Sequence, residues 1–185
     1  MNRRLFLAGL GTAAAVSLRA ADPIPKTDDI TVKNKAVQDL FEQMRAGKYR
    51  AITFPKLSRD DIPALLQMAR SKKSLTSFPR NPFSSQAQTE CPEGMIALWL
   101  IEGWRKWNQH PSLNALCLPT QRTLGGNWDD LSKQNHDRCR DAYEAWWKHA
   151  EKLTDDELKK INPLKDVPLA WYGSAPEPGE APRKP

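Results

Sequence analysis

The side chains with the clearest chemical potential in this sequence are its cysteines and histidines. Cys117 or Cys139 could act as a nucleophile with His110 or His136 as its base, because such partners need only meet in space. His136 and Cys139 could also bind a metal together with Cys91 or Cys117. Zinc sites usually have tighter paired spacings, and the chain contains no Cys-x-x-Cys or His-Glu-x-x-His motif. We therefore predict no metal site.

Two other catalytic patterns are weakly supported. Glu102 follows an apolar run, where loss of hydration could raise the pKa of a carboxyl group for acid–base catalysis. Arg105 at i+3 and Lys106 at i+4 offer an intrahelical ion pair, which is the commoner explanation. Ser84 and Ser85 lack the Gly-x-Ser-x-Gly pattern of serine hydrolases. We predict no catalytic residue and no cofactor.

The tryptophans are the better functional feature, because seven in 185 residues cannot all lie at the centre of so small a core. Trp146 and Trp147 are adjacent, so burying one on a helix tends to leave the other at the edge. A half-exposed tryptophan can anchor a protein partner or stack on a flat-faced ligand. We predict a binding surface formed by Trp107, Trp128, Trp146 and Trp147. The alternative is that the C-terminal "PLAWYG" segment covers them.

The cysteines also bear on redox chemistry. An oxidising compartment would permit one disulfide among Cys91, Cys117 and Cys139, and the sequence does not choose among the three pairings. The alternative is that all three are ordinary core residues.

The N-terminus predicts export. Residues 1–20 contain Arg3 and Arg4, an apolar stretch, and small residues near Ala20 and Ala21, the layout of a cleaved signal of the twin-arginine type. An uncleaved anchor is the alternative, but the stretch of about 14 residues is short of the ~20 that span a bilayer. No cysteine follows to carry a lipid. We expect a periplasmic or extracellular protein that does not span the membrane after cleavage.

Charge argues against nucleic acid as a partner. The net charge of +6 includes three arginines of the predicted signal, and the remaining charges alternate in sign without forming a basic block.

Apolar periodicity predicts an all-α fold, since no stretch alternates in the manner of a strand. About five helices are expected, packed as antiparallel pairs as in helical-repeat proteins. Residues 71–90 and 109–127 are expected to be long ordered loops, followed at the C-terminal end by an extended tail. The helices should begin near Thr31, Ser58, Pro92, Trp128 and Thr154.

One predicted helix should be enclosed by the others. Met95 to Ile101 are all apolar and cover every direction of a helical wheel, so no face of residues 92–107 is left for water. A single domain is expected over residues 22–173, and residues 174–185 are expected to be a disordered tail.

Five stretches carry a resemblance to a known family: "FPRNPFSS", "EGMIALWLIEGWR", "PSLNALCL", "AYEAWWK" and "INPLKDVPLAWYG". In this order they resemble a family of small, secreted or lipid-anchored bacterial proteins of unknown function, over residues 35–173. The resemblance implies a helical extracytoplasmic domain without an assigned activity. The chain departs from lipid-anchored members because its signal is followed by no lipid-attachment cysteine.

Two classes of function remain. The favoured one is an exported, non-catalytic interaction or accessory module. The alternative is a small extracytoplasmic hydrolase or metal-dependent enzyme built on loops 71–90 and 109–127. The first is preferred because no catalytic pattern has a specific motif.

Overall fold

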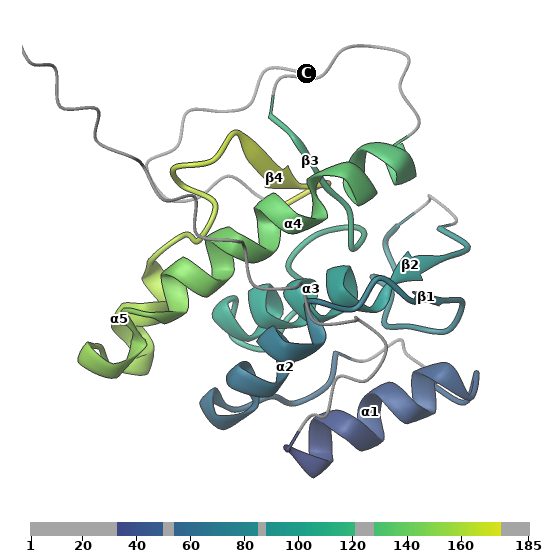
Figure 1. The fold of residues 1–185 in the computed structure, drawn as a ribbon, viewed down its shortest axis with the longest axis horizontal. Helices are drawn as coiled ribbons and strands as arrows, with labels where there is room; N and C mark the ends of the chain where they lie inside the picture. The colour runs from purple at the N-terminus through teal and green to yellow at the C-terminus, as the bar shows by residue number, and fades with distance from the viewer. Residues whose placement is uncertain (1–32, 50–53, 85–87, 121–127, 175–185) are drawn as a thin grey trace, which may run out of the picture.

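The computed structural model describes residues 33–49, 54–84, 88–120 and 128–174. The predicted export signal lies outside these residues, as do residues 175–185 of the predicted tail, whose first residue, Ser174, is described and bonds the Trp171 carbonyl (3.0 Å). The described chain forms five α-helices, two short 3-10 turns and four strands (Figure 1). Their bounds are α1 Lys35–Arg45, η1 Arg59–Asp61, α2 Ile62–Met68, β1 Ser74–Leu75, β2 Cys91–Pro92, α3 Glu93–Arg105, β3 Cys117–Pro119, α4 Trp128–Trp147, η2 Ala150–Lys152, α5 Asp155–Lys160 and β4 Leu169–Trp171.

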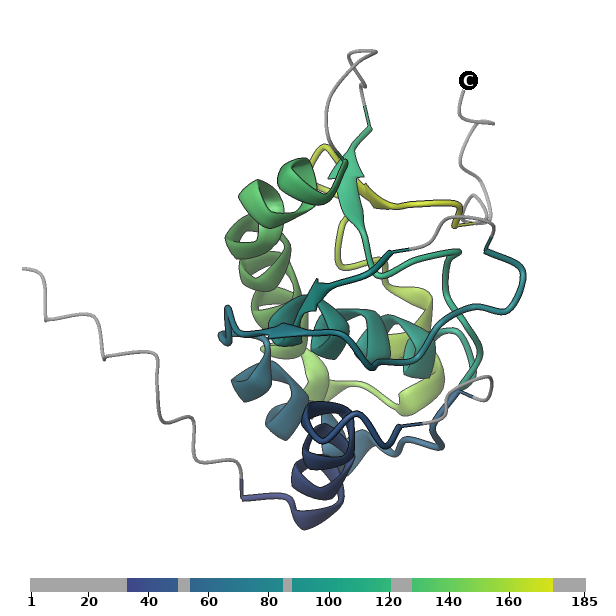
Figure 2. The same cartoon turned by 90° about the vertical axis from the view of Figure 1, so that its right-hand side faces the viewer.

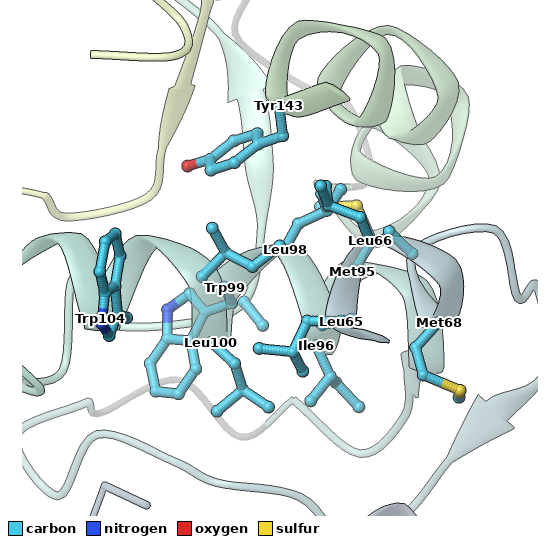
Figure 3. Close-up of a cluster of buried hydrophobic side chains, with 14 of the residues drawn as sticks. Leu65, Leu66, Met68, Met95, Ile96, Leu98, Trp99, Leu100, Trp104 and Tyr143 are labelled. Atoms are coloured by element: carbon cyan, nitrogen blue, oxygen red, sulfur yellow. The ribbon is translucent and has the colours of Figure 1, made fainter. Parts of the chain in front are cut away.

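Helix α3 is the central element. All of its 13 residues are buried, which confirms the prediction of an enclosed helix. It packs against α2, α4 and α5. Figures 1 and 2 show it between α4 and α2, with α1 beyond α2. In Figure 3, Tyr143 of α4 lies over the side of α3 from which Leu98 projects, and Leu100 projects from the opposite side.

Local signals explain where several helices begin. Asn34 caps α1 by accepting a hydrogen bond from the Val37 N–H (3.1 Å). Thr154 and Glu157 form a capping box at the start of α5, where the sequence places one. Pro63 lies in the first turn of α2, where its missing N–H costs no hydrogen bond.

The prediction of an all-α fold is wrong, and so is that of helical-repeat packing. Two antiparallel two-stranded sheets make the fold mixed α/β: β1 pairs with β2, and β3 pairs with β4. The register of the second sheet places Cys117 opposite Trp171 and Pro119 opposite Leu169. Strands of two or three residues are too short to show alternation, and every position of β4 is buried. Strands β1, β3 and β4 lie within segments that the sequence predicts to be loops and a tail, and β2 lies at the predicted start of the central helix.

Among the helices of the described residues, none is both long enough and apolar enough to cross a membrane.

Candidate functional site

The turn that ends α3 carries an unusually placed tryptophan. Trp107 has φ 62° and Asn108 has φ 58°, so both adopt left-handed backbone. The Trp107 N–H bonds the Trp104 carbonyl (3.0 Å) and closes the helix. Glycine usually occupies such a position, because a side chain there is strained. A bulky aromatic residue in this conformation is an outlier that the surrounding structure must hold.

Asn108 supplies that restraint. Its side-chain oxygen accepts from the Leu57 N–H (3.2 Å), and its amide nitrogen donates to the Leu57 carbonyl (3.1 Å). The turn is thereby tied to the segment before α2. Asparagine tolerates left-handed backbone better than most residues, so Asn108 suits both roles. The result is a fixed turn that holds Trp107 with 59% of its surface exposed.

Helix α5 completes the site from the other side. The Lys159 ammonium lies 4.7 Å from the Trp104 ring centroid and 4.4 Å from the Trp107 ring centroid. A cation over an aromatic face is attracted by the negative face of the ring. The Lys159 carbonyl accepts a hydrogen bond from the Arg105 guanidinium (2.9 Å), which holds the end of α5 against α3.

Trp104, which shares Lys159 with Trp107, begins a row of three contacting rings, which we call the tryptophan row: Trp104, Trp146 and Trp147. Trp104 and Trp146 are buried and meet edge to face, with centroids 6.4 Å apart. Trp147 is half-buried beside Trp146, and the Arg59 guanidinium lies 5.8 Å from its ring centroid.

The predicted tryptophan surface therefore consists of side chains that are buried to different extents. Of its four members, Trp107 is exposed, Trp147 is half-buried and Trp146 belongs to the core. Trp128 begins α4, and its side chain lies outside the described residues. Sequence reasoning missed Lys159 and Asn108. An asparagine just after a helix end is a signal for a left-handed turn, whereas no local pattern identifies Lys159 as a partner of the rings.

The chain segments on either side of Trp107 and Lys159 are basic and apolar, whereas the first turn of α5 carries Asp155, Asp156 and Glu157. Residues 103–110 and 158–164 contain three lysines and one arginine but no acid. Ile161, two residues after Lys159, is another exposed large apolar side chain, at 40%. Phe83, 87% exposed, is the third, and it belongs to the separate segment between α2 and α3.

Glu102 lies in a different environment from the exposed site. Its carboxylate accepts two hydrogen bonds from Arg105 (2.9 and 2.6 Å) and one from the Tyr143 hydroxyl (2.6 Å). The Trp171 indole N–H donates to the Tyr143 oxygen (2.8 Å). Burial, followed by the nearby Glu102 charge, raises the pKa of Tyr143 well above its ordinary value. With these partners and 4% exposure, Glu102 is a structural carboxylate of the core.

A second buried polar cluster lies at the start of α3. Glu93 accepts from Arg45 (2.6 Å) and from the Ser71 hydroxyl (2.6 Å). Nearby, His136 contacts the Ala69 carbonyl through Nε2 (2.8 Å) and Lys72 through Nδ1 (3.0 Å). These contacts fit a neutral ring that donates to the carbonyl and accepts from the ammonium. Burial, followed by the Lys72 charge, lowers the pKa of His136 to about 4.

The remaining candidates are spread over several elements. His110 meets the Phe54 ring edge to face and contacts the Trp99 ring at a tilt, and burial lowers its pKa. The three cysteines are buried. Across the part of the chain that the structure describes, no three His, Cys, Asp or Glu side chains are grouped as metal ligands.

The two predicted loops do lie against each other. The Asn81 amide donates to the Ser112 carbonyl (3.0 Å), and the Ser84 hydroxyl bonds the Asn114 side-chain oxygen (2.7 Å). Ser84 thus contacts an amide group, and Ser85 lies outside the described residues.

Comparison with known proteins identifies a family for this chain. A search of curated proteins and a search of solved structures each find no match. The model of one family, described as a domain of unknown function (DUF4943), matches residues 31–172, which is most of the chain. The match confirms the resemblance to a family of unknown function. Because the matched residues make up most of its length, this chain belongs to the DUF4943 family.

Proposed function

We propose that this domain is an exported, non-catalytic interaction module that binds an acidic protein segment at Trp107. The observation that carries the proposal is an exposed tryptophan in strained left-handed backbone, stacked on a lysine. Strain of this kind costs about 1–3 kcal/mol and tends to occur where a site needs it.

The site is suited to binding because it is already ordered. Asn108 fixes the turn, and the Arg105 bond to Lys159 fixes the neighbouring helix end. A partner that docks on a fixed side chain pays little entropy for ordering it. Tryptophan is also among the residues most enriched at binding hot spots.

The chemistry around Trp107 defines the partner. Its exposed ring offers contact to an apolar side chain, and Ile161, just after α5, is also exposed. Lys159 lies against the Trp107 ring and is followed in sequence by Lys160, and residues 103–110 and 158–164 carry no acid. A complementary partner therefore presents an apolar residue flanked by Asp or Glu.

A peptide selection tests this proposal. A random displayed library is selected on the full chain, and enriched peptides are titrated against three proteins: wild type, Trp107→Ser and Phe83→Ser. We expect enriched peptides to combine acidic and apolar residues. Trp107→Ser should weaken their binding by about 30-fold, the equivalent of a hot spot of ~2 kcal/mol. Phe83→Ser, which removes another exposed aromatic ring, should leave binding unchanged.

The proposal fails if the enriched peptides lack acidic residues, or if both variants bind as wild type does. Lys160→Glu adds a check on charge: it should weaken acidic peptides and reduce the salt dependence of their binding. If Phe83→Ser weakens peptide binding and Trp107→Ser does not, the binding surface lies at Phe83 and not at Trp107.

Export to the periplasm or the cell exterior rests on the sequence of residues 1–20. Replacing Arg3 and Arg4 with lysine keeps the charge but removes the paired guanidinium groups. We expect the double variant to remain in the cytoplasm, measured by cell fractionation. Normal export of the variant would replace the twin-arginine assignment with a general secretory signal.

A further inference from the structure

Two of the cysteines come from elements that pack directly on each other. Cys117 is the first residue of β3, and Cys139 lies in the middle of α4. Both are completely buried. Strand β3 packs against α4.

Hydrogen bonds locate Cys117 along α4. Its N–H donates to the Ser132 hydroxyl of α4 (3.1 Å). In the sheet, Cys117 faces Trp171, whose indole N–H donates to the Tyr143 hydroxyl of α4 (2.8 Å). Cys139 is seven residues after Ser132 and four before Tyr143, so all three share one face of the helix. Cys117 is therefore held above the stretch of α4 that carries Cys139.

In this position the Cys117 thiol is a direct neighbour of the Cys139 thiol. We infer that Cys117 and Cys139 form a disulfide when the protein folds in an oxidising environment, linking β3 to α4. The sequence leaves three pairings open, and this contact selects one of them. Export, if it occurs, would supply the environment.

The chemistry requires an oxidant, which is itself a disulfide: a small-molecule disulfide or a dithiol oxidase. The thiolate of one cysteine attacks the oxidant, forms a mixed disulfide and releases one thiol of the oxidant. The second cysteine then attacks the mixed disulfide and releases the other thiol. The protein loses two electrons and two protons, and the oxidant gains them as two thiols.

Burial also determines when the bond can form. Burial, followed by the Cys117 contact, raises the pKa of Cys139 well above its ordinary value. A neutral, inaccessible thiol is a poor nucleophile. The disulfide should therefore form while the chain folds, and the folded, reduced protein should resist oxidation.

Thiol counting and peptide mapping test the inference on the full chain. One sample is refolded with a mixture of oxidised and reduced glutathione, and a second with reductant alone. Both are denatured at low pH, and their thiols are counted with a thiol reagent. We expect two fewer thiols per chain in the oxidised sample, and non-reducing peptide mapping should join the peptides of Cys117 and Cys139. The oxidised protein should also have an unfolding equilibrium constant lower by roughly 300-fold, as the chain-entropy relation gives for a loop of residues 117–139.

Cys91→Ala is the matched control, since Cys91 is equally buried and its thiol bonds the Ala115 carbonyl (3.7 Å). It should keep the oxidised-minus-reduced stability difference, whereas the double variant Cys117→Ala, Cys139→Ala should lose it. An oxidised wild type that retains all its thiols would overturn the inference. A link that includes Cys91, or one between two chains, would also overturn it. The mapping of the wild type decides the question even if a variant fails to fold.

Discussion

The carboxylate of Glu102 shows how a single residue can make the core depend on charge. It bonds Arg105 twice, and both side chains are almost completely buried. Glu102→Gln would leave the guanidinium buried without its counter-charge, which costs about 3–5 kcal/mol. We expect a loss of this size in the free energy of unfolding, measured by urea denaturation.

The matched control for this prediction is Asp39→Asn, which breaks the exposed intrahelical pair of Lys35 and Asp39. An exposed pair contributes about 0–1 kcal/mol, so this variant should be nearly neutral. Equal effects of Glu102→Gln and Asp39→Asn would show that burial does not amplify the Glu102 pair.

Because of His136, we expect the free energy of unfolding to depend on pH. The pKa of His136 is lowered from 6.5 to about 4 in the folded protein, chiefly by burial, and the ring packs closely over Gly94. Between these two pH values the unfolded chain binds the proton more readily than the folded one. The stability that comes from the neutral ring is therefore complete above pH 6.5 and is lost as the pH falls towards 4, by up to about 3 kcal/mol.

Urea unfolding of wild type and His136→Gln at several pH values from 7.5 to 4.5 measures this effect. The glutamine amide can still donate to the Ala69 carbonyl but does not titrate. The difference in stability between the two proteins should shrink or change sign as the pH falls. His149→Gln, at an exposed position, should keep the wild-type slope. Parallel slopes for wild type and His136→Gln would exclude His136 as the source.

Among the elements, the helices could be predicted from sequence because each carries a local signal. The apolar run of α3 and the capping box of α5 depend only on neighbouring residues. Strands β3 and β4 could not be predicted, since each forms only when segments about fifty residues apart meet. The same limit applies to the site: the tryptophans are visible in the sequence, whereas Lys159 joins them only after α5 docks on α3.

At position 107, in the turn after α3, we expect glycine to give a more stable protein than alanine, the reverse of the order within a helix. Trp107→Gly removes the ring and also the left-handed strain, whereas Trp107→Ala removes the ring and keeps the strain. The glycine variant should therefore be more stable than the alanine variant by about 1 kcal/mol. Within α3 the order is the usual one, so Ala97→Gly should destabilise by at least that amount.

Urea denaturation of these variants tests the strain, and peptide binding by the Trp107 pair tests the function. Both Trp107 variants should lose binding, although Trp107→Gly should stay within about 1 kcal/mol of wild-type stability, because the lost cation–π contact is offset by the relieved strain. An alanine variant more stable than the glycine variant would mean that the turn is not strained in solution.

At the scale of the whole molecule, the C-terminal segment closes the fold. Strand β4 pairs with β3, and its Trp171 is buried and bonds Tyr143, which in turn bonds Glu102 of the central helix. A chain that ends at Pro168 lacks this strand and exposes the partners of Trp171. Loss of a buried tryptophan alone costs about 3–5 kcal/mol, a large part of the ~5–15 kcal/mol that stabilises a domain. We expect this chain to lose cooperative thermal unfolding and fixed tertiary structure, seen by near-UV circular dichroism, whereas a chain that ends at Ser174 keeps both.

The variant Trp171→Phe separates the strand pairing from the side-chain hydrogen bond. It keeps the strand and most of the packing but removes the bond to Tyr143, which should lower the free energy of unfolding by about 1 kcal/mol. Cooperative unfolding of the shorter chain near the wild-type temperature would show that β4 only covers a core that α2, α3 and α4 complete by themselves.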